Sequence, residues 1–261
     1  MQTLKDLSRL RDPPLCWLAG YVICILLVGF IFACITQGFI YLTYQFFPQK
    51  TSINNVSVEK WETAQSAELG AWIRGGQKEC REVPKLSEWT MKRFGFKQDQ
   101  FENKVLLDIG PGPVNRLVWL RGEFIAIEPL YNQLKDLPYA NFDKYSTVYT
   151  VPAEHLQTHL IEQVDQVMCI NVLDHCYDAE QVLRNIHIYL KPGEHAFISV
   201  DCDDFNNNDP FHPLQFSSEK LEQLIRDVGL IIIKHSQGRC TPNEDCWGHG
   251  TAHHFWLKKG D

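Results

Sequence analysis

The most apolar part of the chain lies near its N-terminus. Residues 13–49 contain no charged side chain, and residues 16–35 are almost entirely Leu, Ile, Val, Phe, Ala, Cys and Gly. A helix rises about 1.5 Å per residue, so this stretch is long enough to cross the ~30 Å hydrocarbon core of a bilayer. The pattern predicts a transmembrane anchor at residues 15–47 after a tail at residues 1–14. A cleaved signal peptide is the alternative, which the length of the apolar region and the lack of a clear cleavage site disfavour.

The next part of the chain, residues 48–99, is polar and rich in aromatic side chains. Apolar residues recur there with helical spacing at residues 56–73 and 86–94, and glycines and a proline separate the two stretches. The pattern predicts a helical lead-in that caps a ligand pocket. Aromatic side chains on short helices also pack simply against a core. Three tryptophans are candidates to cover the pocket: Trp61, Trp72 and Trp89.

From residue 100 to residue 261, strand and helix patterns alternate, which is typical of a parallel sheet with helices on both faces. The expected strands are residues 105–107, 124–127, 147–151, 166–170 and 195–200. The expected helices are residues 130–137, 154–162, 179–190 and 217–228, and residues 229–235 and 252–258 form a closing pair of strands. This pattern predicts one α/β domain with a doubly wound, mostly parallel sheet and an antiparallel closing strand.

Composition narrows the class of protein. A length of 261 residues with 44% hydrophobic side chains favours one sizeable core plus an appendage. The formal net charge is -7 and no basic run occurs, which disfavours nucleic acid as a partner. The nine cysteines are scattered, so we expect most of them to be reduced and buried rather than paired in disulfides.

Two acidic residues follow expected strands at the spacing of a nucleotide-binding site. Asp108 ends the first strand, and Gly110 and Gly112 lie in the turn after it. Ligands of open α/β sheets bind at such turns because glycine lets the backbone approach closely. Glu128 ends the second strand, where a carboxylate can accept hydrogen bonds from a ribose diol. The spacing suits a nucleoside as well as a nicotinamide dinucleotide.

Five segments in this order resemble the Rossmann-like, or class I, S-adenosylmethionine-dependent methyltransferases, in particular the small-molecule type 11-like branch. The resemblance covers residues 100–258. The segments are Leu107-Asp-Ile-Gly-Pro-Gly, Ala126-Ile-Glu-Pro, Pro152-Ala-Glu-His-Leu, Asn171-Val-Leu-Asp-His and Leu183-Arg-Asn-Ile-His-Ile-Tyr-Leu-Lys-Pro-Gly.

The resemblance implies S-adenosylmethionine as the cofactor and assigns residues to it. Asp108 and the backbone at Gly110 and Gly112 would hold the methionine end of the donor. Glu128 would bind the ribose hydroxyls.

The remaining donor-binding residues follow from the later segments. Ala153 and Glu154 would flank the adenine, and Asn171 would offer its carbonyl to the donor's ammonium group. Val172 and Leu173 would lie beneath the sulfonium.

Three residues depart from the family's pattern. Val114 stands where a third glycine is often found, Pro152 replaces an acidic residue that commonly contacts the adenine amino group, and Glu194 replaces the second glycine of Lys-Pro-Gly-Gly. The first two put the shape of the turn and adenine recognition in question, whereas we expect Glu194 to be harmless.

Two histidines are the candidate catalytic residues. A sulfonium methyl is already activated, so the protein mainly has to align the acceptor, and a general base is needed only for a protonated acceptor. Imidazole as a side chain is suited to proton transfer near neutral pH, and His175 and His212 both follow strand ends, so either suits that role. A structural hydrogen bond is the alternative for each.

Two clusters have metal-ligand residue types. Asp201, Asp203, Asp204 and Asp209 lie near His212, and Cys240, Cys246, His249, His253 and His254 lie near the C-terminus. Solvated acidic side chains and free or paired thiols account for these clusters more simply, so we expect no metal site.

Together these features predict a single-pass membrane protein that methylates a small-molecule, lipid-linked or saccharide acceptor. Lys5, Arg9 and Arg11 before the span mildly favour a cytoplasmic N-terminus. That orientation would put the catalytic domain on the far side of the membrane. The methyl donor, however, is usually cytosolic, so we expect a cytosol-facing catalytic domain.

Two other functions share some of these features. An NAD(P)-dependent oxidoreductase would use the same glycine turn and acid, but the Asn171-Val-Leu-Asp-His segment disfavours it. A catalytically silent membrane scaffold would tolerate Val114 and Pro152.

Overall fold

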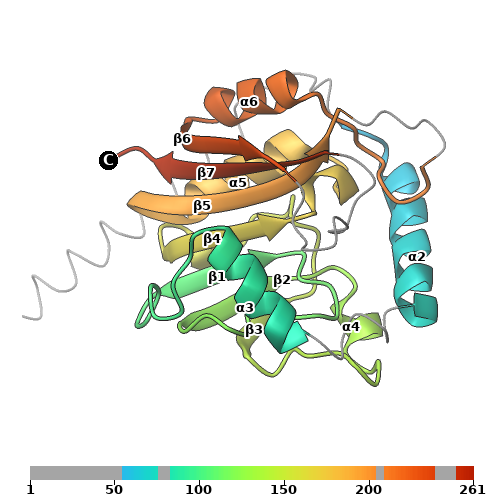
Figure 1. Cartoon of the computed structure of the whole chain (residues 1–261). Helices are drawn as coiled ribbons and strands as arrows, with labels where there is room; N and C mark the ends of the chain where they lie inside the picture. Colours follow the sequence, from blue (N-terminus) through green and yellow to red (C-terminus); the bar gives the residue numbers. More distant parts are fainter. Residues whose placement is uncertain (1–54, 76–82, 204–208, 239–250) are drawn as a thin grey trace, which may run out of the picture. The chain divides into compact units, whose positions relative to one another are not determined.

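The computed structural model describes residues 55–75, 83–203, 209–238 and 251–261 (Figure 1). Residues from Ser52 to Asp261 form one compact unit. The predicted anchor at residues 15–47 lies outside the described residues. Within the described ranges, no helix has the length and apolar character needed to cross a membrane.

A seven-stranded sheet organises the described unit, in the order β3-β2-β1-β4-β5-β7-β6. The strands β1 to β5 are parallel, and β7 pairs antiparallel with both β5 and β6. Their bounds are β1 Val105–Ile109, β2 Glu123–Ile127, β3 Tyr145–Tyr149, β4 Val164–Ile170, β5 Leu190–Cys202, β6 Leu230–Gln237 and β7 Thr251–Lys259. The predicted Rossmann-like sheet with an antiparallel closing strand is confirmed.

The order of the strands locates a ligand crevice. From β1 the chain continues outward to β2 and β3, and it then returns to the other side of β1 for β4 and β5. Ligands of open α/β sheets bind outside the carboxyl ends of the strands at this point of reversal. The residues after β1 and β4 therefore lie where a ligand is expected.

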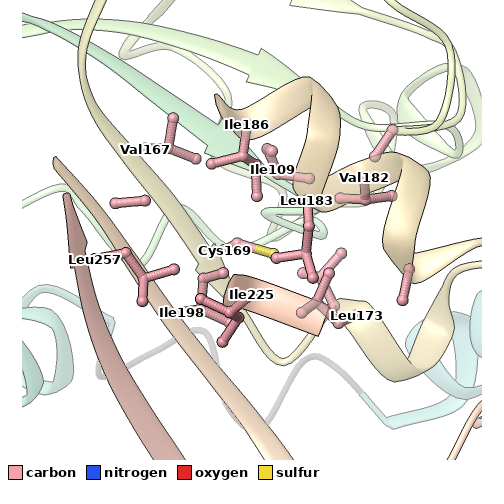
Figure 2. Close-up of a cluster of buried hydrophobic side chains, with 14 of the residues drawn as sticks. Ile109, Val167, Cys169, Leu173, Val182, Leu183, Ile186, Ile198, Ile225 and Leu257 are labelled. Atoms are coloured by element: carbon pink, nitrogen blue, oxygen red, sulfur yellow. The ribbon is translucent and has the colours of Figure 1, made fainter. Parts of the chain in front are cut away.

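One face of the sheet packs against α5 (Ala179–Tyr189) and α6 (Ser218–Asp227). Side chains alternate along strands, so Val167, Cys169 and Ile198 point to this face (Figure 2). Both helices begin at a side-chain cap, as their sequences favour: Asp178 accepts from the Gln181 N–H and Ser217 from the Lys220 N–H.

The other face packs against α3 (Val83–Arg93) and the chain on either side of β1. Met91 and Phe94 meet the intervening strand residues Met168 and Phe197, which alternate with those of the first face. Three described cysteines, Cys169, Cys176 and Cys202, are buried and free, as expected.

The expected helical stretches at residues 56–73 and 86–94 correspond to α2 (Val58–Gly75) and α3. The start of α2 is fixed to the loop after β4, because the Val56 N–H donates to the Tyr177 carbonyl at 2.9 Å. An isolated bridge joins Asn55 to Asp178. These contacts place α2 beside the carboxyl ends of the strands.

Two predicted helices between strands are wrong in extent. The expected helix at residues 154–162 is only the 3-10 turn η2 (Thr158–Leu160), because the Asn185 amide takes up the carbonyls of Ala153 and Glu154 that a helix would use. The expected helix at residues 130–137 shortens to α4 (Tyr131–Leu134).

The predicted turn after α5 also differs. The helix ends at Tyr189 and β5 begins at once with Leu190, so the Lys-Pro-Gly segment lies within the strand. The Gly193 N–H donates to the Gly260 carbonyl at 3.3 Å, which explains how the segment is held.

Candidate functional site

A cleft of about 700 Å³, counted with its open mouth, lies at the carboxyl ends of β1, β2 and β4. The helix α2 forms its opposite wall. Most of the predicted site residues line it: Gly110, Gly112, Glu128, Ala153, Glu154, Asn171, Val172 and His175. The sequence therefore identified the cleft, although the predicted Asp108 and His212 are not among its described lining residues.

The turn after β1 requires its two glycines. Gly110 has φ +63° and Gly112 has φ +62°, a backbone conformation that other residues rarely adopt. A Cβ atom on Gly110 would lie 2.7 Å from a methyl group of Val172. Val114, which departs from the family's pattern, pairs with Asn141. The backbone of this turn is thus exposed to a ligand in the cleft.

The Glu128 carboxylate is tied to the glycine turn. One oxygen accepts from the Gly112 N–H and the other from the Leu130 N–H, both at 2.9 Å. The side chain is 4% exposed, and burial raises its pKa to about 7. The carboxylate therefore both shapes the turn and lines the cleft.

Asp108 is directed away from the cleft toward β3. Its carboxylate accepts a hydrogen bond from the Tyr145 hydroxyl at 2.6 Å. Burial raises the pKa of Asp108 to about 7, although Tyr145 and Arg116 oppose the rise. The structure thus places this carboxyl behind the turn.

Asn185 of α5 holds the loop after β3 through two hydrogen bonds. The Asn185 amide, which is fully buried, donates to the Ala153 carbonyl at 2.8 Å and to the Glu154 carbonyl at 2.9 Å. The Glu154 carboxylate accepts from the Tyr177 N–H at 2.7 Å and the Asp178 N–H at 3.1 Å. Glu154 therefore joins the loops after β3 and β4 at the edge of the cleft.

Asn171 and Val172 follow β4 directly. Asn171 has φ +59°, and its N–H donates to the Ser199 carbonyl of β5 at 2.7 Å. Val172 packs against Gly110 across the crevice. This conformation turns the chain across the end of the sheet, where both residues line the cleft.

The two predicted catalytic histidines lie together, with ring centroids 4.4 Å apart. His175, in the 3-10 turn η3 (Leu173–His175), lines the cleft. The Nδ1 atom of His212 lies 2.6 Å from a carboxylate oxygen of Asp209. Burial alone would lower the pKa of His212, but the carboxylates of Asp174 and Asp209 raise it above the ordinary value.

One face of α2 supplies the opposite wall. Trp61, Gln65, Glu68 and Trp72 line the cleft at the three- and four-residue spacing of one helical face. Trp61 and Trp72 were candidates from the sequence, whereas Trp89 is not among the described lining residues. Apart from this spacing, nothing in the sequence indicated that Gln65 and Glu68 line the cleft.

Arg116 is a further lining residue that the sequence did not single out. Its guanidinium donates to the Ile170 carbonyl at 3.3 Å. Its charge lowers the pKa values of Asp108 and Glu128 against the larger effect of burial. Among the described residues of the cleft wall, Arg116 is the one lysine or arginine.

The residues with metal-ligand side chains near the C-terminus separate into two groups. Cys240, Cys246 and His249 lie outside the described residues, as does Asp204. His253 and His254 are both buried in β7, where His253 contacts His235 at 2.9 Å and His254 contacts Ser199 at 2.9 Å. Each histidine thus has its own hydrogen-bond partner, on opposite sides of the strand.

A family model described as a methyltransferase domain matches residues 80–235, which is more than half of the chain. The chain belongs to this family. It is an S-adenosylmethionine-dependent methyltransferase. Family membership favours this activity over the oxidoreductase and the silent scaffold.

Solved structures share the methyltransferase's fold at low sequence identity. One is the 1,6-didemethyltoxoflavin-N1-methyltransferase of Burkholderia thailandensis, solved with bound 1,6-didemethyltoxoflavin and S-adenosylhomocysteine. It is 15% identical in sequence with a TM-score of 0.55, and the match covers 82% of this chain and 94% of that one. A SAM-dependent methyltransferase of Leishmania major is also 15% identical with a TM-score of 0.55, covering 77% of this chain and 82% of that one. A comparison with curated proteins finds no match.

The residues of the cleft fit S-adenosylmethionine. A Cβ atom on Gly112 would approach the Trp72 ring to 3.3 Å, so glycine allows the turn and α2 to lie close together at the cleft. Glu128 offers carboxylate oxygens to hydroxyl groups, and Arg116 offers a cation to a carboxylate. The methyltransferase therefore has groups of suitable chemistry for both ends of its donor.

Proposed function

We propose that the methyltransferase is membrane-anchored and methylates a small-molecule, lipid-linked or saccharide acceptor in the cleft between α2 and the carboxyl ends of the strands. The observation that carries the proposal is His175, which lines the cleft beside the expected donor site and contacts a second imidazole. The apolar run at residues 15–47 supports the anchor. It ends shortly before α2, so an acceptor at a membrane surface suits this arrangement.

The donor would be held by groups around the glycine turn. We infer that the Glu128 carboxylate binds the ribose hydroxyls, and that the backbone at Gly110 and Gly112 lies against the donor. Arg116 would pair with the methionine carboxylate. When bound, S-adenosylmethionine supplies an activated methyl group on a sulfonium.

His175 would act as a general base that accepts the proton of the acceptor group. Its ring lies 3.4 Å from the Asn171 side-chain amide and at the cleft wall, so it is within reach of an acceptor placed there. The Asn171 amide and the His212 ring restrict its orientation. A general base held in this way needs no change of conformation to accept a proton.

Calorimetric titration of the full chain in detergent with S-adenosylmethionine, and separately with NADH, tests donor binding. We expect donor binding in the wild type and its loss in Glu128→Ala, which removes the inferred ribose ligand. Glu123→Ala, on the exposed start of the same strand, is the matched control and should bind normally. No donor binding by a folded wild type, or NADH binding in its place, would contradict the donor site.

The anchor and the acceptor require separate measurements. Sedimentation with membranes should require residues 1–51. Transfer of labelled methyl groups to a membrane extract should require His175, so His175→Gln should lower turnover while leaving donor binding intact. Recovery of the full chain in the soluble fraction would contradict the anchor.

A further inference from the structure

Three side chains beside the cleft have the chemistry of metal ligands. Asp174 and His175 come from η3, and His212 comes from the segment before α6. Their ligand atoms all lie within 4.8 Å of one another. The cluster joins two segments that are far apart in the sequence, and only His175 of the three lines the cleft.

The orientation of His212 matches that of a metal ligand. Its Nδ1 atom lies 2.6 Å from an Asp209 oxygen, so an Nδ1–H donated there leaves Nε2 with a free lone pair. Ligating histidines commonly donate their other ring N–H to a carboxylate in this way. Nε2 lies 3.7 Å from an Asp174 oxygen, which is too long for a hydrogen bond. Two ligands about 2.1 Å from a shared tetrahedral ion are separated by about 3.4 Å.

Asp174 also lacks part of its expected hydrogen bonding. The residue is 4% exposed, and within the described part of the chain its Oδ1 atom has no hydrogen-bond partner. Burial of a carboxylate without compensation is costly, so such groups are normally paired or coordinate a metal. A cation bound by Asp174 and the two imidazoles would compensate the charge of this buried carboxylate.

We propose that Asp174, His175 and His212 bind a divalent transition-metal ion of the zinc class, with Asp209 orienting His212. Two imidazoles and one carboxylate suit zinc, cobalt or iron, whereas magnesium prefers oxygen ligands. Three protein ligands are typical of sites that keep an open position for a substrate. The site faces the cleft through His175.

The ion deepens the proposed function, and its catalytic role rests on that function. An acceptor hydroxyl bound at the open position would release its proton to water more readily, because the cation stabilises the oxyanion. His175 and His212 would then serve as ligands in place of a general base. Binding of the ion itself does not depend on which acceptor is methylated.

Cobalt binding to the metal-free full chain in detergent tests the proposal. After treatment with a chelator, we expect one equivalent of Co²⁺ to bind per chain, with visible absorption of low coordination number and displacement by Zn²⁺. Mg²⁺ in excess should not compete. Asp174→Asn and His212→Gln should each weaken binding at least about 100-fold, since each removes a ligand. Asp209→Asn should weaken it about 10- to 100-fold, as expected for loss of an outer hydrogen bond.

His159→Gln is the control, because this histidine is exposed on η2 and should leave binding unchanged. Donor binding by each variant reports whether it is folded. Absence of stoichiometric Co²⁺ binding by the folded wild type overturns the proposal. So does binding that persists in Asp174→Asn and His212→Gln. Neither result depends on methyl transfer, so failure of the metal site is distinguishable from failure of the proposed function.

Discussion

Replacement of Glu128 by glutamine should remove a loss of stability that the wild type shows as pH rises from about 5 to 8. The carboxyl is 4% exposed, and burial raises its pKa from the ordinary 4.5 to about 7. Glutamine has nearly the same shape but does not ionise. The pH dependence of the difference between variant and wild type therefore reports the ionisation of the buried carboxyl.

The size of the effect follows from the rise in pKa. A change from 4.5 to about 7 is a factor of about 10 to the power 2.5 in proton affinity. At 1.36 kcal/mol for each factor of ten, it corresponds to about 3 kcal/mol. Below pH 4.5 the carboxyl is protonated in both the folded and the unfolded chain, so ionisation contributes nothing. Between pH 4.5 and about 7 mainly the unfolded chain ionises, so the wild type loses stability as pH rises.

The glutamine variant lacks this loss but has one acceptor oxygen for two N–H donors. The unsatisfied donor, from Gly112 or Leu130, costs about 1–3 kcal/mol at every pH. We therefore expect the variant to be less stable than the wild type near pH 5. Its relative stability should then improve by about 2–3 kcal/mol from pH 5 to pH 8.

Denaturant unfolding of both proteins without donor, followed by tryptophan fluorescence at intervals from about pH 5 to 8, measures this difference. Glu123→Gln, at the exposed start of β2, is the control and should show no comparable trend. A difference between wild type and Glu128→Gln that stays constant over the range would refute the argument, because it would mean that the carboxyl titrates alike in the folded and unfolded states.

Two further substitutions test the construction of the cleft. Gly110→Ala places a Cβ atom 2.7 Å from a Val172 methyl group at φ +63°, so titration should show donor binding weakened at least tenfold. The control is Gly95→Ala, which has a similar positive φ of +87° but open space around the new Cβ atom, and it should leave donor binding intact. Asn185→Leu leaves the carbonyls of Ala153 and Glu154 without their donor, so it should lower the free energy of unfolding by about 2–4 kcal/mol. A cost below about 1 kcal/mol for Asn185→Leu would contradict its role as the clamp of this loop.

Local sequence patterns predicted the strands well because each strand contains a run of apolar, aromatic or β-branched side chains, which in β4 is buried throughout. They also located Gly110, Glu128 and Asn171, since each follows a strand and its position depends only on the order of the sheet. The expected helix at residues 154–162 was wrong because Asn185, from a distant helix, takes up the carbonyls that would have begun it.

The other surprises also depend on contacts between distant segments. Nothing in the sequence near Asp108 indicates that Tyr145 draws its carboxylate behind the turn. Likewise, Asp174 and His212 lie 38 positions apart, and only the folded chain brings them to 3.7 Å. Roles that depend on two residues distant in the sequence could therefore not be predicted from local sequence patterns.

The position of β7 has a consequence for how the protein is made. Residues 251–259 form an interior strand of the sheet, between β5 and β6, and β6 has no other strand neighbour among the described residues. During synthesis β6 leaves the ribosome before the strand on which it will pair. The backbone of Leu230, Ile231 and Ile232 then stays unpaired until their partners at residues 257–259 have emerged. A chain interrupted before residue 251 would keep that strand edge open, and such edges promote association with other chains.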